Sequence, residues 1–186
     1  MAQRTIVEYP AAVLKQRCAE VEDFDDELAT LIDDMRETMV DAEGLGLAAN
    51  QVGVSLRVFT MLDAVEGDDP EATEVVELVN PVIVARRGEI RFEEGCLSFP
   101  GISENVLRSA EVDVTFRNRD GSEQQRTFRG VSAVCVQHEL DHLDGVTFLD
   151  RLSPLKRRLA LRSFTRSQEA RRWEAIEEQR SLVRGR

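Results

Sequence analysis

A His-Glu-x-x-His pattern carries the clearest chemical signal in this sequence. In His138-Glu-Leu-Asp-His142 the two imidazoles are four residues apart, and on a helix this spacing puts them on one face, one turn apart. Two such imidazoles can bind one divalent ion, and Glu139 can approach a water that the ion makes more acidic. We therefore predict a metal-dependent hydrolase with His138 and His142 as ligands and Glu139 as the general acid/base.

The same pattern also has an ordinary structural interpretation, in which the histidines of a core or surface helix only form hydrogen bonds. Short motifs do occur by chance. However, Val134, Val136, Leu140 and Leu143 flank the motif and predict a buried helix. Buried imidazoles and carboxylates need compensating partners, and a metal ion supplies them. The metal site is therefore the favoured interpretation.

A mononuclear site needs a third ligand, and Cys96 is the best candidate. The chain has no third histidine, and the acidic residues after His142 do not form a convincing set. Cys96 lies in the short segment Glu94-Gly-Cys-Leu-Ser98, and a thiolate suits soft or borderline divalent ions. A cysteine beside a glycine is more often a small packed residue, so this assignment depends on the missing donor.

The other cysteines predict no disulfide framework. The chain has three cysteines and no Cys-x-x-Cys pair, which favours reduced thiols. Cys135 precedes His138 by three residues, so we expect it near the same helix face as a pocket-wall or core residue. Cys18 has no neighbour that suggests chemistry and is interpreted as an incidental thiol.

Length and composition predict one globular domain. The 186 residues are 42% hydrophobic and 32% charged, a balance that argues against extended disorder. No apolar run approaches the ~20 residues that span a bilayer, so we expect no membrane partner. The first ten residues lack the apolar core of a secretory signal, and a cytoplasmic location is expected.

Charge is distributed unevenly. Residues 151–186 contain eleven Lys/Arg and four Asp/Glu, a net charge of +7, which leaves −18 for residues 1–150 of the total −11. The acidic body would repel nucleic acid, so we expect no DNA partner. The basic tail, in contrast, can attract a phosphate backbone.

The elements that position these residues follow from hydrophobic spacing and turn signals. They predict an α+β fold: a single domain with antiparallel or mixed sheets around a central metal-binding helix, plus a long C-terminal helix. Residues 1–150 would form the catalytic part, and 151–186 a basic helix packed on or extending from it. The predicted helices are 25–42, 131–143 and about 154–182, and the predicted strands are 54–62, 75–79, 82–85, 112–116 and 125–129, with a loop at 63–74.

Three segments, taken together and in order, resemble peptide deformylase. They are Gly44-Leu-Gly-Leu-Ala-Ala-Asn-Gln51, Glu94-Gly-Cys-Leu-Ser98 and Gln137-His-Glu-Leu-Asp-His-Leu-Asp-Gly145. The resemblance implies a hydrolase that removes the formyl group from N-formylmethionyl nascent peptides. It also implies one divalent ion on Cys96, His138 and His142, with Fe²⁺ expected in the cell and Zn²⁺, Ni²⁺ or Co²⁺ as substitutes.

The resemblance also assigns roles around the metal. Gln51 and the Leu97 backbone N–H would stabilise the oxyanion, although Gln51 alone is more simply a polar residue at a strand end. Glu94, Gln137 and Asp141 would orient the ligands. The basic helix would contact the ribosome transiently, or its Leu155, Leu159, Phe164 and Trp173 would simply pack it on the body. The substrate would meet Leu45, Gly46, Gly95, Val131, Val134, Cys135 and Arg108.

Two other functional classes remain open at this stage. An endopeptidase of the His-Glu-x-x-His type would take its third ligand from Asp or Glu and would not need Cys96. A metal-stabilised binding module on the ribosome would close the site with a fourth protein ligand, and the sequence offers no obvious candidate for one.

Overall fold

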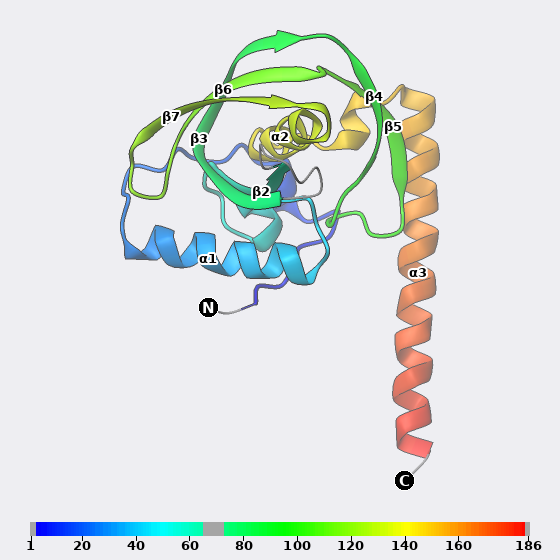
Figure 1. Ribbon diagram of the computed structural model, residues 1–186. Coiled ribbons are helices and arrows are strands. Elements are labelled where there is room, and N and C mark those ends of the chain that lie inside the picture. Colours follow the sequence, from blue (N-terminus) through cyan, green and yellow to red (C-terminus); the bar gives the residue numbers. More distant parts are fainter. Residues whose placement is uncertain (1–2, 65–72, 185–186) are drawn as a thin grey trace.

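Helix α2 (Gly130–Leu143) lies at the centre of the fold, and the strands curve around it (Figure 1). The computed structural model describes residues 3–64 and 73–184. Every residue of α2 from Ala133 to Leu143 is buried, and the helix contacts strands of both sheets. The predicted α+β fold around a central helix is therefore confirmed.

Two antiparallel sheets surround α2. The larger has the strand order β1-β2-β3-β6-β7, and the smaller pairs β4 with β5. Neighbouring strands of the larger sheet are all antiparallel. The strands are β1 (Gly46–Ala48), β2 (Val58–Ala64), β3 (Thr73–Arg87), β4 (Ile90–Gly95), β5 (Ser103–Arg108), β6 (Glu111–Arg117) and β7 (Glu123–Arg129).

Helix α1 (Asp26–Asp41) agrees closely with the helix predicted at residues 25–42. The Asp25 carboxylate caps its N-terminus by accepting hydrogen bonds from the backbone N–H groups of Glu27 and Leu28, both at 3.0 Å. Its apolar face packs on β1 and β2, so α1 covers the larger sheet on the side away from α2. The buried residues of α1 are Leu28, Leu31, Ile32, Asp34, Met35, Thr38 and Met39.

Asn80 and Pro81 do not interrupt the strand in which they lie, contrary to the prediction of two separate strands. Strand β3 runs through them, and the pairing register with β6 shifts between Val79 and Val82. Asn80 adopts a positive φ of 50°. Its side-chain amide exchanges two hydrogen bonds of 2.9 Å with the backbone of Val21, which holds this irregularity in place.

Strand β2 begins later than predicted, at Val58 rather than Val54, because the residues before it pair elsewhere. The N–H of Arg57 donates to the carbonyl of Ala19 at 2.7 Å, and the N–H of Ala19 donates to Ser55 at 3.0 Å. The segment predicted as a loop at 63–74 is strand at both described ends, with Asp63 opposite Glu74. Residues 65–72 lie outside the described part of the chain.

Helix α3 (Pro154–Arg184) starts against the body and then extends beyond it (Figure 1). Ala160 and Phe164 are buried in an aromatic cluster with Phe99 and Phe148. Further along, Arg171 forms a bidentate ion pair with Glu8 at 3.0 and 3.1 Å. These contacts tie α3 to the domain as far as Arg171.

The predicted packing residues of this helix are only partly correct. Phe164 packs on the body, but Leu155, Leu159 and Trp173 are 57%, 52% and 62% exposed. The face of the helix that carries Ala160 and Phe164 packs on the domain. Leu155 and Leu159 lie four residues apart on a different face, which is exposed to solvent. No helix in the described residues is long and apolar enough to span a membrane.

Candidate active site

Two separate segments bring Cys96, His138 and His142 together. Cys96 directly follows β4, and the histidines lie one turn apart on α2. The Cys96 Sγ is 3.2 Å from Nε2 of His142, and the ligand atoms of all three residues lie within 4.8 Å of one another. Ligands at about 2.0–2.3 Å from a tetrahedral ion are roughly 3.5 Å apart, so this donor set fits one metal ion.

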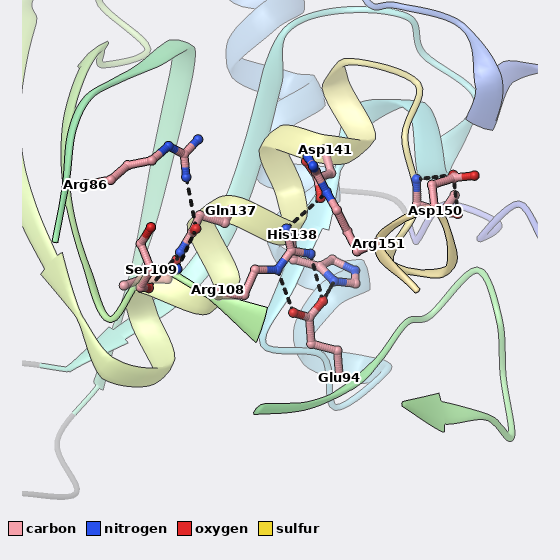
Figure 2. A network of polar contacts seen from close by, with 11 residues as sticks. Arg86, Glu94, Arg108, Ser109, Gln137, His138, Asp141, Asp150 and Arg151 are labelled. Carbon is pink, nitrogen blue, oxygen red and sulfur yellow. Dashed lines mark hydrogen bonds and ion pairs between the residues drawn. The ribbon is translucent and has the colours of Figure 1, made fainter. Parts of the chain in front are cut away.

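Glu94 orients the first histidine. Its Oε2 lies 2.8 Å from Nδ1 of His138 (Figure 2). A carboxylate accepts there, so Nδ1 carries a proton and Nε2 is the nitrogen left for an ion. Burial opposes the charged form, but the hydrogen bonds with Cys96 and Glu94 outweigh it and raise the pKa of His138 well above its ordinary value, so an ion that binds at Nε2 would displace a proton. Burial alone would raise the pKa of Glu94, but the hydrogen bonds from Arg108 and His138 outweigh it and lower the pKa to about 2. Glu94 is therefore ionised.

Arg108 holds Glu94 from the other side. Its Nε and Nη2 donate to the two oxygens of Glu94 at 2.6 and 2.9 Å, and its Nη1 donates to Asp141 at 2.6 Å. The Arg108 side chain is 4% exposed and does not line the pocket of about 360 Å³ that adjoins Cys96, His138 and Glu139. The structure thus places Arg108 behind His138, where it binds Glu94 and Asp141, and not on the pocket wall.

His142 is held through its backbone. The Asn50 side-chain amide donates to the His142 carbonyl at 2.6 Å, a link that the sequence did not reveal. Burial, followed by the neighbouring His138, lowers the pKa of His142 well below its ordinary value. The imidazole is therefore neutral, as a metal ligand requires.

Glu139 lies beside the three ligand residues with a free oxygen. It is buried, and its Oε2 has no hydrogen-bond partner among the described residues. Burial raises the pKa of Glu139 to about 7, against the opposing effect of His138. A carboxyl group with a pKa near neutrality can both accept and return a proton, as general acid/base chemistry requires.

Gln51 reaches the site from the 3₁₀ turn η2 (Ala49–Val52). Its Oε1 accepts from the Ala48 N–H at 2.8 Å, which directs the amide NH₂ toward Ser98 Oγ at 3.2 Å and Cys96 Sγ at 3.5 Å. The donor end of Gln51 thus faces the ligand cluster. Ser98 had not been predicted, although it belongs to the Cys96 segment.

A pocket of about 360 Å³ opens beside this cluster. The predicted residues Leu45, Gly46, Gly95, Val131, Val134 and Cys135 all line it, together with Gln51, Leu97, His138 and Glu139. Sequence reasoning missed further lining residues whose apolar character has an equally good explanation in the core, namely Phe92, Phe99 and Ile102.

Cys135 is part of the pocket wall, as predicted. Its Sγ donates to the Leu45 carbonyl at 3.4 Å. Burial, reinforced by nearby carboxylates, raises the pKa of Cys135 well above its ordinary value, so the group stays a neutral thiol. A neutral thiol is a poor metal ligand, so Cys135 is not a candidate ligand.

Two strand edges border the pocket. Strand β1 is an edge strand of the larger sheet, and β4 pairs only with β5 among the described strands. Gly46 lies at the start of β1, where a Cβ would come within 2.5 Å of Glu139 Oε1 and 2.7 Å of Cys135 Sγ. The absence of a side chain at residue 46 therefore lets β1 approach the Glu139 carboxylate.

The fold and the site together define a mononuclear metal-dependent hydrolase with an apolar pocket. The family model for polypeptide deformylase matches residues 3–158. The chain belongs to this family, whose members are metal-dependent and remove the formyl group from nascent peptides.

Individual relatives agree with this assignment. The chain is 48% identical to a peptide deformylase of Syntrophobacter fumaroxidans over 84% of this chain and 91% of the relative. It is 44% identical to that of Aquifex aeolicus, over 91% and 99%. Among solved structures, a peptide deformylase from Legionella pneumophila has a TM-score of 0.83 at 43% identity, covering 91% of this chain and 98% of that one. One from Ehrlichia chaffeensis in complex with actinonin has a TM-score of 0.82 at 36% identity, covering 90% and 98%.

The Gly46→Ala substitution tests the close approach of β1. The added methyl group must displace Glu139 or Cys135, so we expect hydrolysis of a formyl-Met peptide to fall by a factor of 10 or more, since about 1.4 kcal/mol of transition-state stabilisation corresponds to tenfold. Metal content should stay at one ion per chain because the clash does not involve a ligand. Full activity of Gly46→Ala would contradict this packing.

Proposed function

We propose that this chain removes the N-terminal formyl group from nascent peptides at an ion held by Cys96, His138 and His142. The observation that carries the proposal is the position of Glu139. Its partner-free oxygen adjoins the three ligand residues in a pocket. A divalent ion bound there supplies Lewis acidity, which polarises the formyl carbonyl and makes a nearby water more acidic.

The substrate peptide fits along the edge of β1. A peptide in extended form can hydrogen-bond to an unpaired strand edge, and the Gly46 edge and β4 border the same pocket. Leu45 and Val131, which are 49% and 46% exposed, lie at the rim. Val134 and Cys135 lie deeper in the wall, where an apolar methionine side chain would be enclosed.

Glu139 moves the proton in this proposal. As the nucleophilic water attacks the formyl carbon, Glu139 accepts its proton. It then returns that proton to the departing amine, which leaves as a free N-terminus, while the formyl group leaves as formate. The raised pKa of Glu139 suits both steps, because a group with a pKa near the working pH accepts and donates with little driving force lost.

Gln51 and Leu97 are the proposed donors to the developing oxyanion. The Gln51 amide already points its NH₂ group toward the ligand cluster, and Leu97 lies next to Cys96 on the pocket wall. One well-placed donor of this kind contributes about 3 kcal/mol to the transition state. Glu94 and Arg108 maintain the ligand geometry from behind, and Gln137 stays tied to Ser109 and Arg86.

Fe²⁺ is the ion we propose for the cell, with Zn²⁺, Ni²⁺ or Co²⁺ able to replace it. One thiolate and two neutral imidazoles accept all four ions. An endopeptidase with a carboxylate ligand is less well supported. In the described part of the chain, the side chains that lie close enough together to bind one ion are those of Cys96, His138 and His142, with no carboxylate among them.

The Glu139→Gln substitution tests the acid/base assignment. Glutamine keeps the size of the side chain but cannot accept the proton, so we expect formate release from a formyl-Met peptide to fall at least about 100-fold. The metal content should not change. Glu20→Gln, at an exposed glutamate, is the control and should behave like the parent. Substantial turnover by Glu139→Gln would remove Glu139 from the mechanism.

The Cys96→Ser substitution tests the ligand set. A serine hydroxyl is a weaker ligand than a thiolate, so the variant should purify with much less than one ion per chain and release little formate. Cys18→Ser alters a buried thiol outside the site and should keep its ion. If Cys96→Ser retained a full complement of metal, the endopeptidase-type site would be favoured instead.

The basic C-terminal helix is proposed to bring the enzyme to the ribosome in the cytoplasm. Its positive charge is concentrated in the part that packs on the domain. Residues 151–172 contain eight Lys/Arg and one Glu, whereas residues 173–186 contain three Lys/Arg and three Glu. Arg158, Arg162 and Arg166 are exposed at four-residue spacing and form one stripe on α3. Such a stripe can follow a phosphate backbone.

Co-sedimentation with ribosomes tests this contact. Replacing Arg158, Arg162 and Arg166 with Glu should abolish binding at low salt, while activity on a free formyl-Met peptide should remain within about twofold. Deletion of residues 173–186 removes no net charge and should have a smaller effect. Equal sedimentation of the parent and the charge-reversed protein would eliminate the ribosome contact.

A further inference from the structure

Asp141 has two arginine partners that come from different parts of the fold. It is buried on α2, next to the ligand residue His142. Its Oδ2 accepts from Arg108 Nη1 at 2.6 Å and from Arg151 Nε at 2.9 Å. Its Oδ1 also accepts from Arg151 Nη2. Arg151 therefore binds Asp141 with two donors. Both side chains are labelled in Figure 2.

Arg151 is held in place by the turn that carries it. It ends the 3₁₀ turn η3 (Phe148–Arg151), whose Phe148 and Leu149 are buried. Asp150 stabilises the start of this turn by accepting from the N–H and Oγ1 of Thr147 at 2.9 and 2.8 Å. The guanidinium of Arg151 thus extends toward α2 from a fixed backbone.

A continuous chain of polar contacts connects Arg151 to the metal site. From Arg151 it passes to Asp141, then through Arg108 to Glu94, and from Glu94 to Nδ1 of His138. The buried part of this chain holds two carboxylates, Glu94 and Asp141, and one guanidinium, Arg108. Without Arg151, the Asp141 carboxylate would lose two of its three arginine donors where water has little access, which is costly.

We infer that Arg151 is a positioning residue for the metal ligand His138. Asp141 and Glu94 share a single buried guanidinium, and Arg151 satisfies Asp141 so that Arg108 can keep both of its bonds to Glu94. If Arg151 is removed, Arg108 is the only arginine left to bind Asp141. The hydrogen bonds from Arg108 to Glu94 are then weakened, and His138, which Glu94 orients, becomes less fixed. The inference rests on the proposed function in that His138 is taken to be a ligand.

Arg151 acts at a distance from the substrate. It does not line the pocket beside Glu139 but a separate polar groove on the other face of α2, together with Gln137, Leu140 and Asp141. Its effect should therefore appear in the properties of the bound ion and in kcat, with the KM for a formyl-Met peptide unchanged within about twofold.

The test compares the parent protein, Arg151→Ala and Arg151→Lys, each loaded with Co²⁺. For Arg151→Ala we expect the cobalt ligand-field absorption to shift, metal release into excess chelator to accelerate about 3- to 10-fold, and kcat to fall by a similar factor. Partners of metal ligands typically alter metal affinity or activity by 10- to 100-fold when removed, and Arg151 is two partners away. Arg151→Lys keeps the charge but not the two-pronged geometry, so it should be intermediate.

Arg117→Ala is the matched control. Arg117 is similarly exposed, at 45% compared with 49% for Arg151, and it also pairs with one carboxylate, Glu123. It should match the parent in spectrum and metal release. Arg151 variants with parental spectrum, metal release and kcat would overturn the inference, whatever their melting temperature, and Arg151→Lys provides this result if Arg151→Ala does not fold. A parent protein that binds no cobalt would overturn the proposed function as well.

Discussion

A central helix that buries charged and polar side chains on both faces must find a partner for each of them. Helix α2 has this requirement along Gln137, His138, Glu139, Asp141 and His142, all of which are buried. A buried polar group without a partner costs several kcal/mol, so the surrounding elements are arranged to supply those partners. Strands β4 and β5 and the turn η3 each contribute one or more, and Asn50 adds a hydrogen bond to the backbone carbonyl of His142.

The polar groups on the two faces of α2 have different kinds of partner. On one face, His138 and Glu139 meet Cys96 at a pocket, and the carboxylate of Glu139 keeps an oxygen without a protein partner. On the other face, Asp141 and Gln137 are fully engaged with arginine, serine and backbone groups. The reactive side can stay open because the supporting side is satisfied. Rigid support behind the ligands is what metal sites need for defined geometry.

Much of this arrangement could be predicted from local sequence, and the remainder depends on tertiary structure. Asp25 and the spacing of apolar residues define α1 locally, and the ligand spacing on α2 follows from helix geometry. Strands β4 and β5 were not predicted, although Ile90 and Phe92 alternate with polar residues. The contacts of Arg108 and Arg151 with buried carboxylates were not visible either, because nothing near an arginine in sequence indicates which distant carboxylate it will meet.

The edges of β1 and β4 that pair with no other described strand have a consequence for when the enzyme can act. If the substrate binds along these edges as proposed, a chain end whose first residues have already folded into a helix or an inner strand cannot lie beside them in extended form. Binding of the emerging terminus at this site would then compete kinetically with its folding into secondary structure. Proteins whose first strand or helix forms late would stay accessible for longest.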